Sequence, residues 1–259
     1  MALIKTSNPA LGQNTFSEFA RSQYGGNLVD ASARMTLNGA INKTGILLLC
    51  AVATAAWTWN SFMQAHDANV AYLALVVGGL GGFIFAMITS FKRTWAPVTA
   101  PIYAALEGLA LGGISAVFEL SSYHGIAMQA VGLTFGTLFV MLLAYKSGLI
   151  KVTDKFRLGV FAATGGIMFF YMITWLLSIF HSSLFSSAFG SSAIGIGFSL
   201  IVVAVAALNL VLDFAFVEQG VTSGAPKYMD WYAAFGIMVT LVWLYLEILR
   251  LLANLNNRR

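Results

Sequence analysis

Apolar and polar residues alternate along the chain in long blocks, and the apolar blocks have the length of membrane-spanning helices. A helix crosses the hydrocarbon layer of a bilayer with about 20 predominantly apolar residues. Seven such blocks follow a polar first stretch, with short connections between them. Their predicted limits are Ile41–Trp59, Val70–Ser90, Pro97–Phe118, Ile126–Tyr145, Leu158–Phe180, Ala193–Phe216 and Trp231–Ala253. The pattern predicts an all-α integral membrane protein, a bundle of seven transmembrane helices.

The predicted domain organisation follows from these blocks. Residues 1–37 are rich in Ser, Asn, Gly and Ala and lack an apolar face large enough to fold alone, which predicts a mobile cytoplasmic N-terminal arm. Residues 38–255 are expected to form a single transmembrane domain, and residues 256–259 a basic tail. Lys5 is followed by polar residues rather than by an apolar run, so no cleavable signal peptide is expected.

Composition supports the membrane class and excludes several others. The 259 residues are 59% hydrophobic and 9% charged, whereas soluble domains carry about 25% charged residues. The net charge of +4 falls in the connections between apolar blocks, so the lipid bilayer is the expected partner and no nucleic acid is. Cys50 is the single cysteine, which excludes an intrachain disulfide and a cysteine-based metal site.

Lysine and arginine predict the orientation, because they accumulate in cytoplasmic loops. They precede the first span and occupy alternate connections, while the connections 60–69, 119–125 and 181–192 hold none. This places the N-terminus in the cytoplasm and the protein in the inner cell membrane. Arg250, Arg258 and Arg259 follow the seventh span and conflict with this orientation if that span crosses fully. A re-entrant seventh span would remove the conflict, and the sequence leaves both arrangements open.

The sixth span carries an acid, Asp213, inside its apolar run. An ionised Asp at the centre of a bilayer costs about 3 kcal/mol on insertion scales, so Asp213 is expected to face protein or water rather than lipid. Asn209 lies one helical turn earlier on the same face. Asp213 is either a packing group hydrogen-bonded to a neighbouring helix or an acid that lines an ion path or acts as a pH-sensitive gate.

Two further acids and two cations complete the predicted polar set. Glu107 lies about 15 Å along the third span, and Glu247 about 24 Å along the seventh. Each is either part of an ion path or a structural group: Glu107 an interhelical strut, Glu247 a partner of Arg250 three residues on. Lys92 and Arg93 lie at the inner membrane boundary, within snorkelling reach of Asp213. An ion pair between Asp213 and Arg93 would form a latch that protonation of Asp213 releases.

The remaining polar groups indicate no catalysis, cofactor or metal. Sequence patterns of serine hydrolases, zinc peptidases, intramembrane aspartyl proteases and phosphate loops are absent, so the protein is not expected to be an enzyme. Three histidines lie in separate predicted outer loops without ligand spacing. Three acids at span ends are expected to be solvated. These residues are His66, His124 and His181, and Glu119, Asp154 and Asp230.

Small residues recur at four-residue spacing within three spans, at Gly78–Gly82, Gly108–Gly112 and Gly132–Gly136. This spacing lets two helices approach closely. It predicts tight packing within the chain, with a dimer face as the alternative.

Several stretches resemble the Bax inhibitor-1 family, also called the transmembrane BAX inhibitor motif family, in its bacterial branch. They are the Lys92-Arg93 turn, Thr134–Gly148, NLVLDFAFVEQG at Asn209–Gly220 and WLYLEILRLL at Trp243–Leu252. The resemblance covers about Ile41 to Leu252. It implies a fold in which six helices surround the seventh.

The resemblance also implies a pH-sensitive calcium leak controlled by two aspartates and a basic latch residue. Asp213 matches the first aspartate, and Arg93 or Lys92 matches the latch. The second aspartate corresponds to Glu247 in one alignment and to Thr240, which cannot ionise, in another. Glu107, which matches no family motif, is a third source of the missing acid. One function class left open is therefore an ion leak or channel, with calcium or protons as the permeant ion. The alternative function is a non-conducting regulator that binds a membrane protein such as a protease or a stress-response partner.

Overall fold

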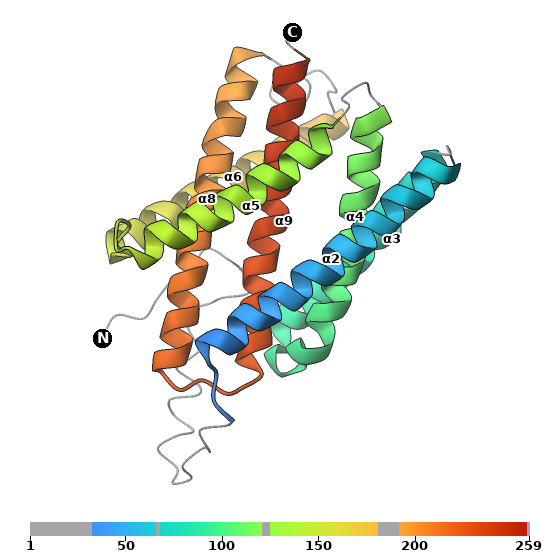
Figure 1. Ribbon diagram of the computed structural model, residues 1–259. Coiled ribbons are helices and arrows are strands. Elements are labelled where there is room, and N and C mark those ends of the chain that lie inside the picture. Colours follow the sequence, from blue (N-terminus) through green and yellow to red (C-terminus); the bar gives the residue numbers. More distant parts are fainter. Residues whose placement is uncertain (1–32, 66–67, 121–124, 181–191, 258–259) are drawn as a thin grey trace. The chain divides into compact units, whose positions relative to one another are not determined.

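The computed structural model describes residues 33–65, 68–120, 125–180 and 192–257, and this part of the chain is almost entirely helical (Figure 1). Seven of the described helices are long and apolar enough to cross a membrane. They are α2 (Leu37–Ala65), α3 (Ala68–Phe91), α4 (Ala96–Leu120), α5 (Ile126–Lys146), α6 (Asp154–Phe180), α8 (Ala193–Thr222) and α9 (Met229–Asn256). Each contains one predicted span, so the seven-helix prediction is confirmed.

The chain divides into two compact units that share the last two helices. Unit 1 consists of Met1–Ser122 and Asp213–Val239, and unit 2 of Tyr123–Leu212 and Thr240–Arg259. Unit 1 therefore contains α2, α3 and α4 with the end of α8 and the start of α9. Unit 2 contains α5 and α6 with the start of α8 and the end of α9.

Glycines allow α2, α3 and α4 of unit 1 to pack closely, because they have no side chain between the helices. A side chain at Gly108 or Gly112 of α4 would overlap the backbone of α2, and one at Gly113 would overlap the backbone of α3 at Ala71. Gly78 of α3 meets the backbone of α4 at Ala110 in the same way. The prediction of close packing within the chain is confirmed for these two glycine-rich stretches.

The third glycine pair behaves differently. Gly132 and Gly136 lie on α5 of unit 2, are exposed, and have no atom within 4 Å of where a β-carbon would lie. The expectation of tight packing is wrong here, because the spacing shows only that a helix can be approached closely. The dimer face stays a prediction.

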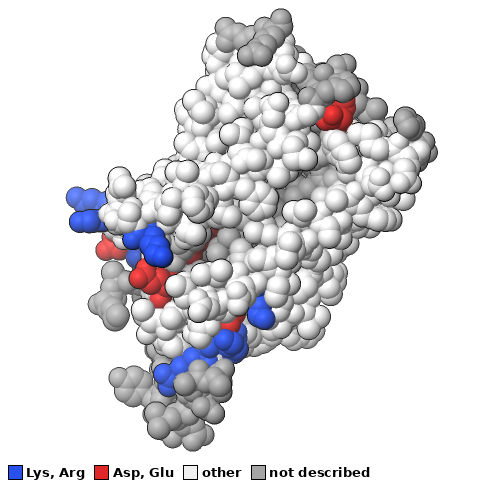
Figure 2. Space-filling model, in the orientation of Figure 1, with Lys and Arg blue, Asp and Glu red and all other residues white. Residues whose placement is uncertain are grey.

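The two shared helices are the most enclosed of the seven. In their most apolar stretches, 72% of the residues of α8 and 67% of those of α9 are buried, against 17% to 44% in the other five helices. The central position of α9 stays a prediction. Over most of the face drawn in Figure 2 the surface carries no charge, and lysines, arginines and acids gather in a few places. Such a surface suits contact with lipid.

A short connection brings α3 into α4 and carries both predicted latch residues. It contains Lys92 and the 3₁₀ turn η2 (Arg93–Trp95). The amide of Lys92 donates to the carbonyl of Ile88 (2.8 Å), and the amide of Trp95 donates to the carbonyl of Lys92 (2.9 Å). A hydrogen bond between the hydroxyls of Thr89 and Thr99 (2.7 Å) ties the two helices together beside the turn.

Candidate functional site

Asp213 is the acid that the sequence singled out, and protein encloses it. It lies in α8 at the start of the part that belongs to unit 1, and only 1% of it is exposed. Its neighbours Leu212 and Phe214 are apolar and buried as well. The prediction that Asp213 avoids lipid is confirmed. A carboxylate in such surroundings costs free energy unless it is paired or protonated, so its charge state is coupled to the groups around it.

Arg93 and Lys92, the two predicted latch residues, also belong to unit 1 and point to different neighbours. The Arg93 guanidinium lies over the ring of Tyr232 in α9, 5.7 Å from the ring centre. The Lys92 ammonium lies over the ring of Trp95 at 4.4 Å, and Lys92 is exposed. Arg93 is half-buried. Of the two cations, Arg93 is therefore the one that contacts α9, and its ion pair with Asp213 stays a prediction.

Glu107 occupies space that a glycine leaves open. It lies on α4 of unit 1 and is half-buried, and a β-carbon at Gly82 of α3 would overlap its carboxylate. One turn earlier, the buried ring of Tyr103 packs edge-on against Phe235 of α9, with 5.0 Å between ring centres. The structure thus places a second acid of unit 1 within the helix packing.

Glu247 is the predicted acid of α9, and its carboxylate has two partners within unit 2. The Tyr171 hydroxyl of α6 donates to Oε1 of Glu247 at 2.9 Å, and the Arg250 guanidinium forms an ion pair with Oε2. Arg250 also donates to the Tyr171 hydroxyl. The predicted pair of Glu247 with Arg250 is confirmed, so the charge of this acid is already balanced within its unit.

Asn209 and Thr240, the two uncharged members of the predicted set, are buried in unit 2. The amide of Asn209 donates to the Thr164 hydroxyl of α6 (2.8 Å) and to the carbonyl of Val205 (2.9 Å). Asn209 thereby joins α8 to α6, which gives it a structural role whatever else it does. Thr240 is 4% exposed.

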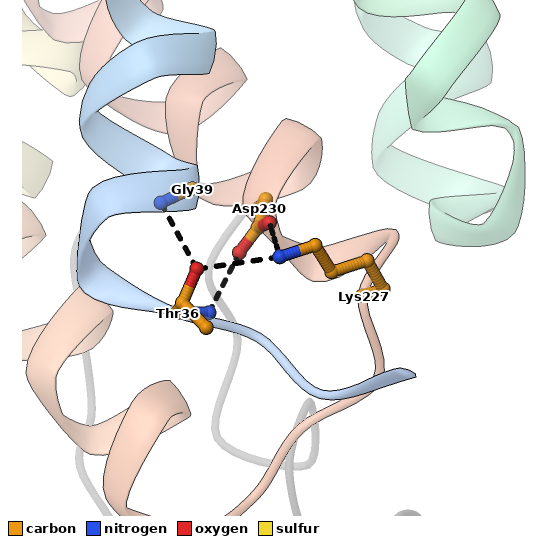
Figure 3. A network of polar contacts seen from close by, with 4 residues as sticks. All are labelled: Thr36, Gly39, Lys227 and Asp230. Carbon is orange, nitrogen blue, oxygen red and sulfur yellow. Dashed lines mark hydrogen bonds and ion pairs between the residues drawn. The ribbon is translucent and has the colours of Figure 1, made fainter. Parts of the chain in front are cut away.

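Asp230, at the start of α9 in unit 1, was expected to be solvated, and that expectation is wrong. The residue is fully buried. Oδ1 accepts the backbone N–H of Thr36 (3.0 Å), and Oδ2 forms an ion pair with the Lys227 ammonium (3.1 Å), as Figure 3 shows. The spacing of Lys227 and Asp230 is a signal that could have indicated the ion pair. No pattern in the sequence indicates Thr36.

The described residues contain no group of three or more His, Cys, Asp and Glu side chains that could hold a metal ion. The three histidines predicted to lie in outer loops, His66, His124 and His181, are outside the described residues.

Comparison with known proteins gives one match. The family described as Bax inhibitor 1 like matches residues 8–257, nearly the whole chain. No curated protein and no solved structure matches the sequence.

Proposed function

Because this chain belongs to the Bax inhibitor 1 like family, we propose that it is a pH-sensitive calcium leak in which Asp213 is the gate. The observation that carries the proposal is the burial of Asp213 in an apolar helix of a multi-pass membrane protein. Such acids characteristically mark ion and proton paths. Ca²⁺ is a hard cation that prefers carboxylate oxygens.

The proposed latch is formed by Asp213 and Arg93, both in unit 1. At neutral pH the ionised carboxylate and the guanidinium attract each other and hold the path closed. Protonation removes the negative charge of Asp213 and with it this attraction, so the leak opens as the pH falls. The alternation of Lys and Arg in the connections supports a cytoplasmic location for Arg93, and a cytoplasmic N-terminus in an inner cell membrane.

We assign the role of the second acid to Glu107 rather than to Glu247 or Thr240. Glu107 lies in the same unit as Asp213, whereas Glu247 is in unit 2 with its carboxylate paired to Arg250. Thr240 has no ionisable group. Replacing Glu107 by Gln is therefore expected to lower calcium flux at acidic pH.

The test is calcium-indicator flux into proteoliposomes of the purified protein between pH 5 and pH 8. The wild-type protein should pass more calcium at the acidic end. Asp213→Asn should remove the pH dependence, because an amide cannot form the ionised half of the latch. Arg93→Gln should raise the flux at pH 8 toward its acidic value.

Glu218→Gln is the matched control, since it removes an exposed acid from the same helix, α8. This variant should keep the wild-type pH profile. If Asp213→Asn and Glu218→Gln change the profile equally, Asp213 is not the gate. If the wild-type protein passes no calcium at any pH, the leak is wrong for this chain, and the non-conducting regulator that binds a membrane-protein partner takes its place.

A further inference from the structure

Two segments far apart in the sequence are joined in unit 1 by a short antiparallel pairing. The amide of Met35 donates to the carbonyl of Ala225 (2.6 Å), and the amide of Lys227 donates to the carbonyl of Ala33 (2.8 Å). Arg34 and Pro226 lie opposite each other between these two hydrogen bonds and form an isolated antiparallel β-bridge. The pairing fastens the chain just before α2 to the turn between α8 and α9. We call residues 33–36 together with residues 225–230 the clasp.

Side chains strengthen the clasp beside this pairing, around the buried Asp230 carboxylate described above. The Thr36 hydroxyl accepts from the Gly39 amide (3.0 Å) and from the Lys227 ammonium (3.3 Å). Thr36 thus acts as the N-cap of α2 and at the same time binds the start of α9 through its own amide. The four residues form the closed network of Figure 3.

The position of Gly39 within this network leaves no room for a side chain. A β-carbon there would overlap the Asp230 carboxylate and the Thr36 hydroxyl. Six residues further along α2, a β-carbon at Gly45 would meet nothing within 4 Å. The same helix therefore offers one glycine on which the clasp depends and one on which it does not.

The clasp fixes the part of α9 that contacts the proposed latch. Asp230 is followed by Trp231, whose ring lies under the Lys43 ammonium of α2 at 4.7 Å, and by Tyr232, whose ring lies under Arg93. Three consecutive residues of α9 are thus held by the segment before α2, by α2 and by the α3–α4 connection. A shift of the first turn of α9 would move the ring on which Arg93 rests.

We propose that Asp230 is a positioning residue and that the clasp must separate before the leak opens. While closed, the clasp keeps Tyr232 beneath Arg93 and so holds Arg93 in its latched position. When it separates, the first turn of α9 is free to move and Arg93 loses its aromatic support. This inference rests on the proposed function for its effect on flux, and on the contacts alone for its effect on structure.

The structural part is tested by hydrogen exchange of the full-length protein, comparing Gly39→Ala with Gly45→Ala. Both changes replace glycine by alanine within α2, which by itself favours the helix by roughly 1 kcal/mol. Gly39→Ala should speed exchange in peptides that contain Met35, Thr36 and Lys227, and also in peptides that contain η2 and the first turn of α9. Gly45→Ala should speed none of these. Equal exchange in the two variants would overturn the clasp whether or not the protein conducts calcium.

The functional part is tested by locking the clasp with a disulfide. Arg34 and Pro226 are a non-hydrogen-bonded pair, a geometry in which the α-carbons of opposing residues lie about 4.5 Å apart, within the range of disulfides. Arg34→Cys with Pro226→Cys is made in a Cys50→Ser background, with each single cysteine variant as a control. Oxidation should lower calcium flux at pH 5 by about tenfold, the scale of coupling between two conformational elements, and a reducing agent should restore it.

The outcomes of the two tests separate the inference from the proposed function. If the lock forms and the oxidised protein passes calcium as fast as the reduced one, the clasp is structural only and the inference is wrong. If wild-type protein passes no calcium, the proposed function fails, and the exchange of η2 and of the first turn of α9 in Gly39→Ala still decides whether Asp230 positions them. Exchange confined to the clasp itself would contradict the positioning role.

Discussion

Helix α9 buries two acids, Asp230 in its first turn and Glu247 in its second half, and the two acids are held in different ways. Asp230, in unit 1, and Glu247, in unit 2, each form an ion pair with a cation three residues away, Lys227 and Arg250. Each also accepts one hydrogen bond from a distant residue. For Asp230 the donor is the backbone N–H of Thr36, and for Glu247 it is the side-chain hydroxyl of Tyr171.

The exposure of the cations distinguishes the two pairs. The Lys227 side chain is 49% exposed and lies outside α9, whereas the Arg250 side chain is 24% exposed and lies within it. Without its acid, Lys227 is therefore easier to solvate where it lies than Arg250 is. The comparison teaches that a buried acid can be a local charge partner, as at Glu247, or an anchor for a remote backbone segment, as at Asp230.

The largest effect is expected from removing Glu247. Glu247→Leu removes the carboxylate that balances the charge of the partly buried Arg250, which should lower the free energy of unfolding by about 3 kcal/mol. Replacing Arg250 by Leu as well should restore most of the loss, because a buried ion pair contributes little beyond apolar packing. Denaturant unfolding in detergent micelles measures both variants. A double variant as unstable as the single one would show that the pair is not the local unit described here.

A smaller effect is expected from removing Asp230. Asp230→Ala removes the hydrogen bond from the Thr36 amide to a charged, buried carboxylate, which should cost about 2 kcal/mol of unfolding free energy. Asp230→Asn should recover about half of this, since its side-chain oxygen still accepts from Thr36 while the charge is lost. The same unfolding assay ranks the variants. If alanine and asparagine cost the same, the bond to Thr36 contributes nothing and the contrast between the two acids disappears.

The smallest effect is expected from the exposed cation. Lys227→Gln should lower the unfolding free energy by only about 1 kcal/mol at low salt, because Lys227 is the exposed member of the pair and the glutamine amide can still donate to the buried Asp230 carboxylate. Raising the salt concentration should reduce this difference further, because ions screen solvent-exposed charges. The cost of Glu247→Leu should change little over the same salt series. Equal salt sensitivity of the two variants would contradict the difference in exposure.

The seven long helices could be predicted from the sequence, because each apolar block is long enough to span a membrane and is bounded by polar residues. The sequence also indicated that Asp213 avoids lipid, since the cost of an ionised group in hydrocarbon acts on any helix. The pair of Glu247 with Arg250 was predictable because both lie on one helix, three residues apart.

The rest of the candidate site depends on which helices meet, and a single sequence does not encode that locally. Thr36 contacts Asp230 across 194 positions, and no periodic pattern links the two. Asp230 directly precedes an apolar block, and an acid in that position is expected to be solvated. In the same way, identical glycine spacing in α4 and α5 gave close packing in one helix and an open surface in the other.

The distance along the chain between Thr36 and Asp230 has a consequence for synthesis. At about 5–20 residues per second, a ribosome needs about 10–40 s to travel from one to the other. During that time α2, α3 and α4 have been made and can pack against one another at their glycines. The amide of Thr36 has no Asp230 carboxylate to bind until residue 230 has been made. Unit 1 thus begins to fold before α9 is made and cannot close until the first turn of α9 has been made. A nascent chain stalled before residue 225 would keep α2, α3 and α4 and lack the contact that fastens Thr36, just before α2, to α9.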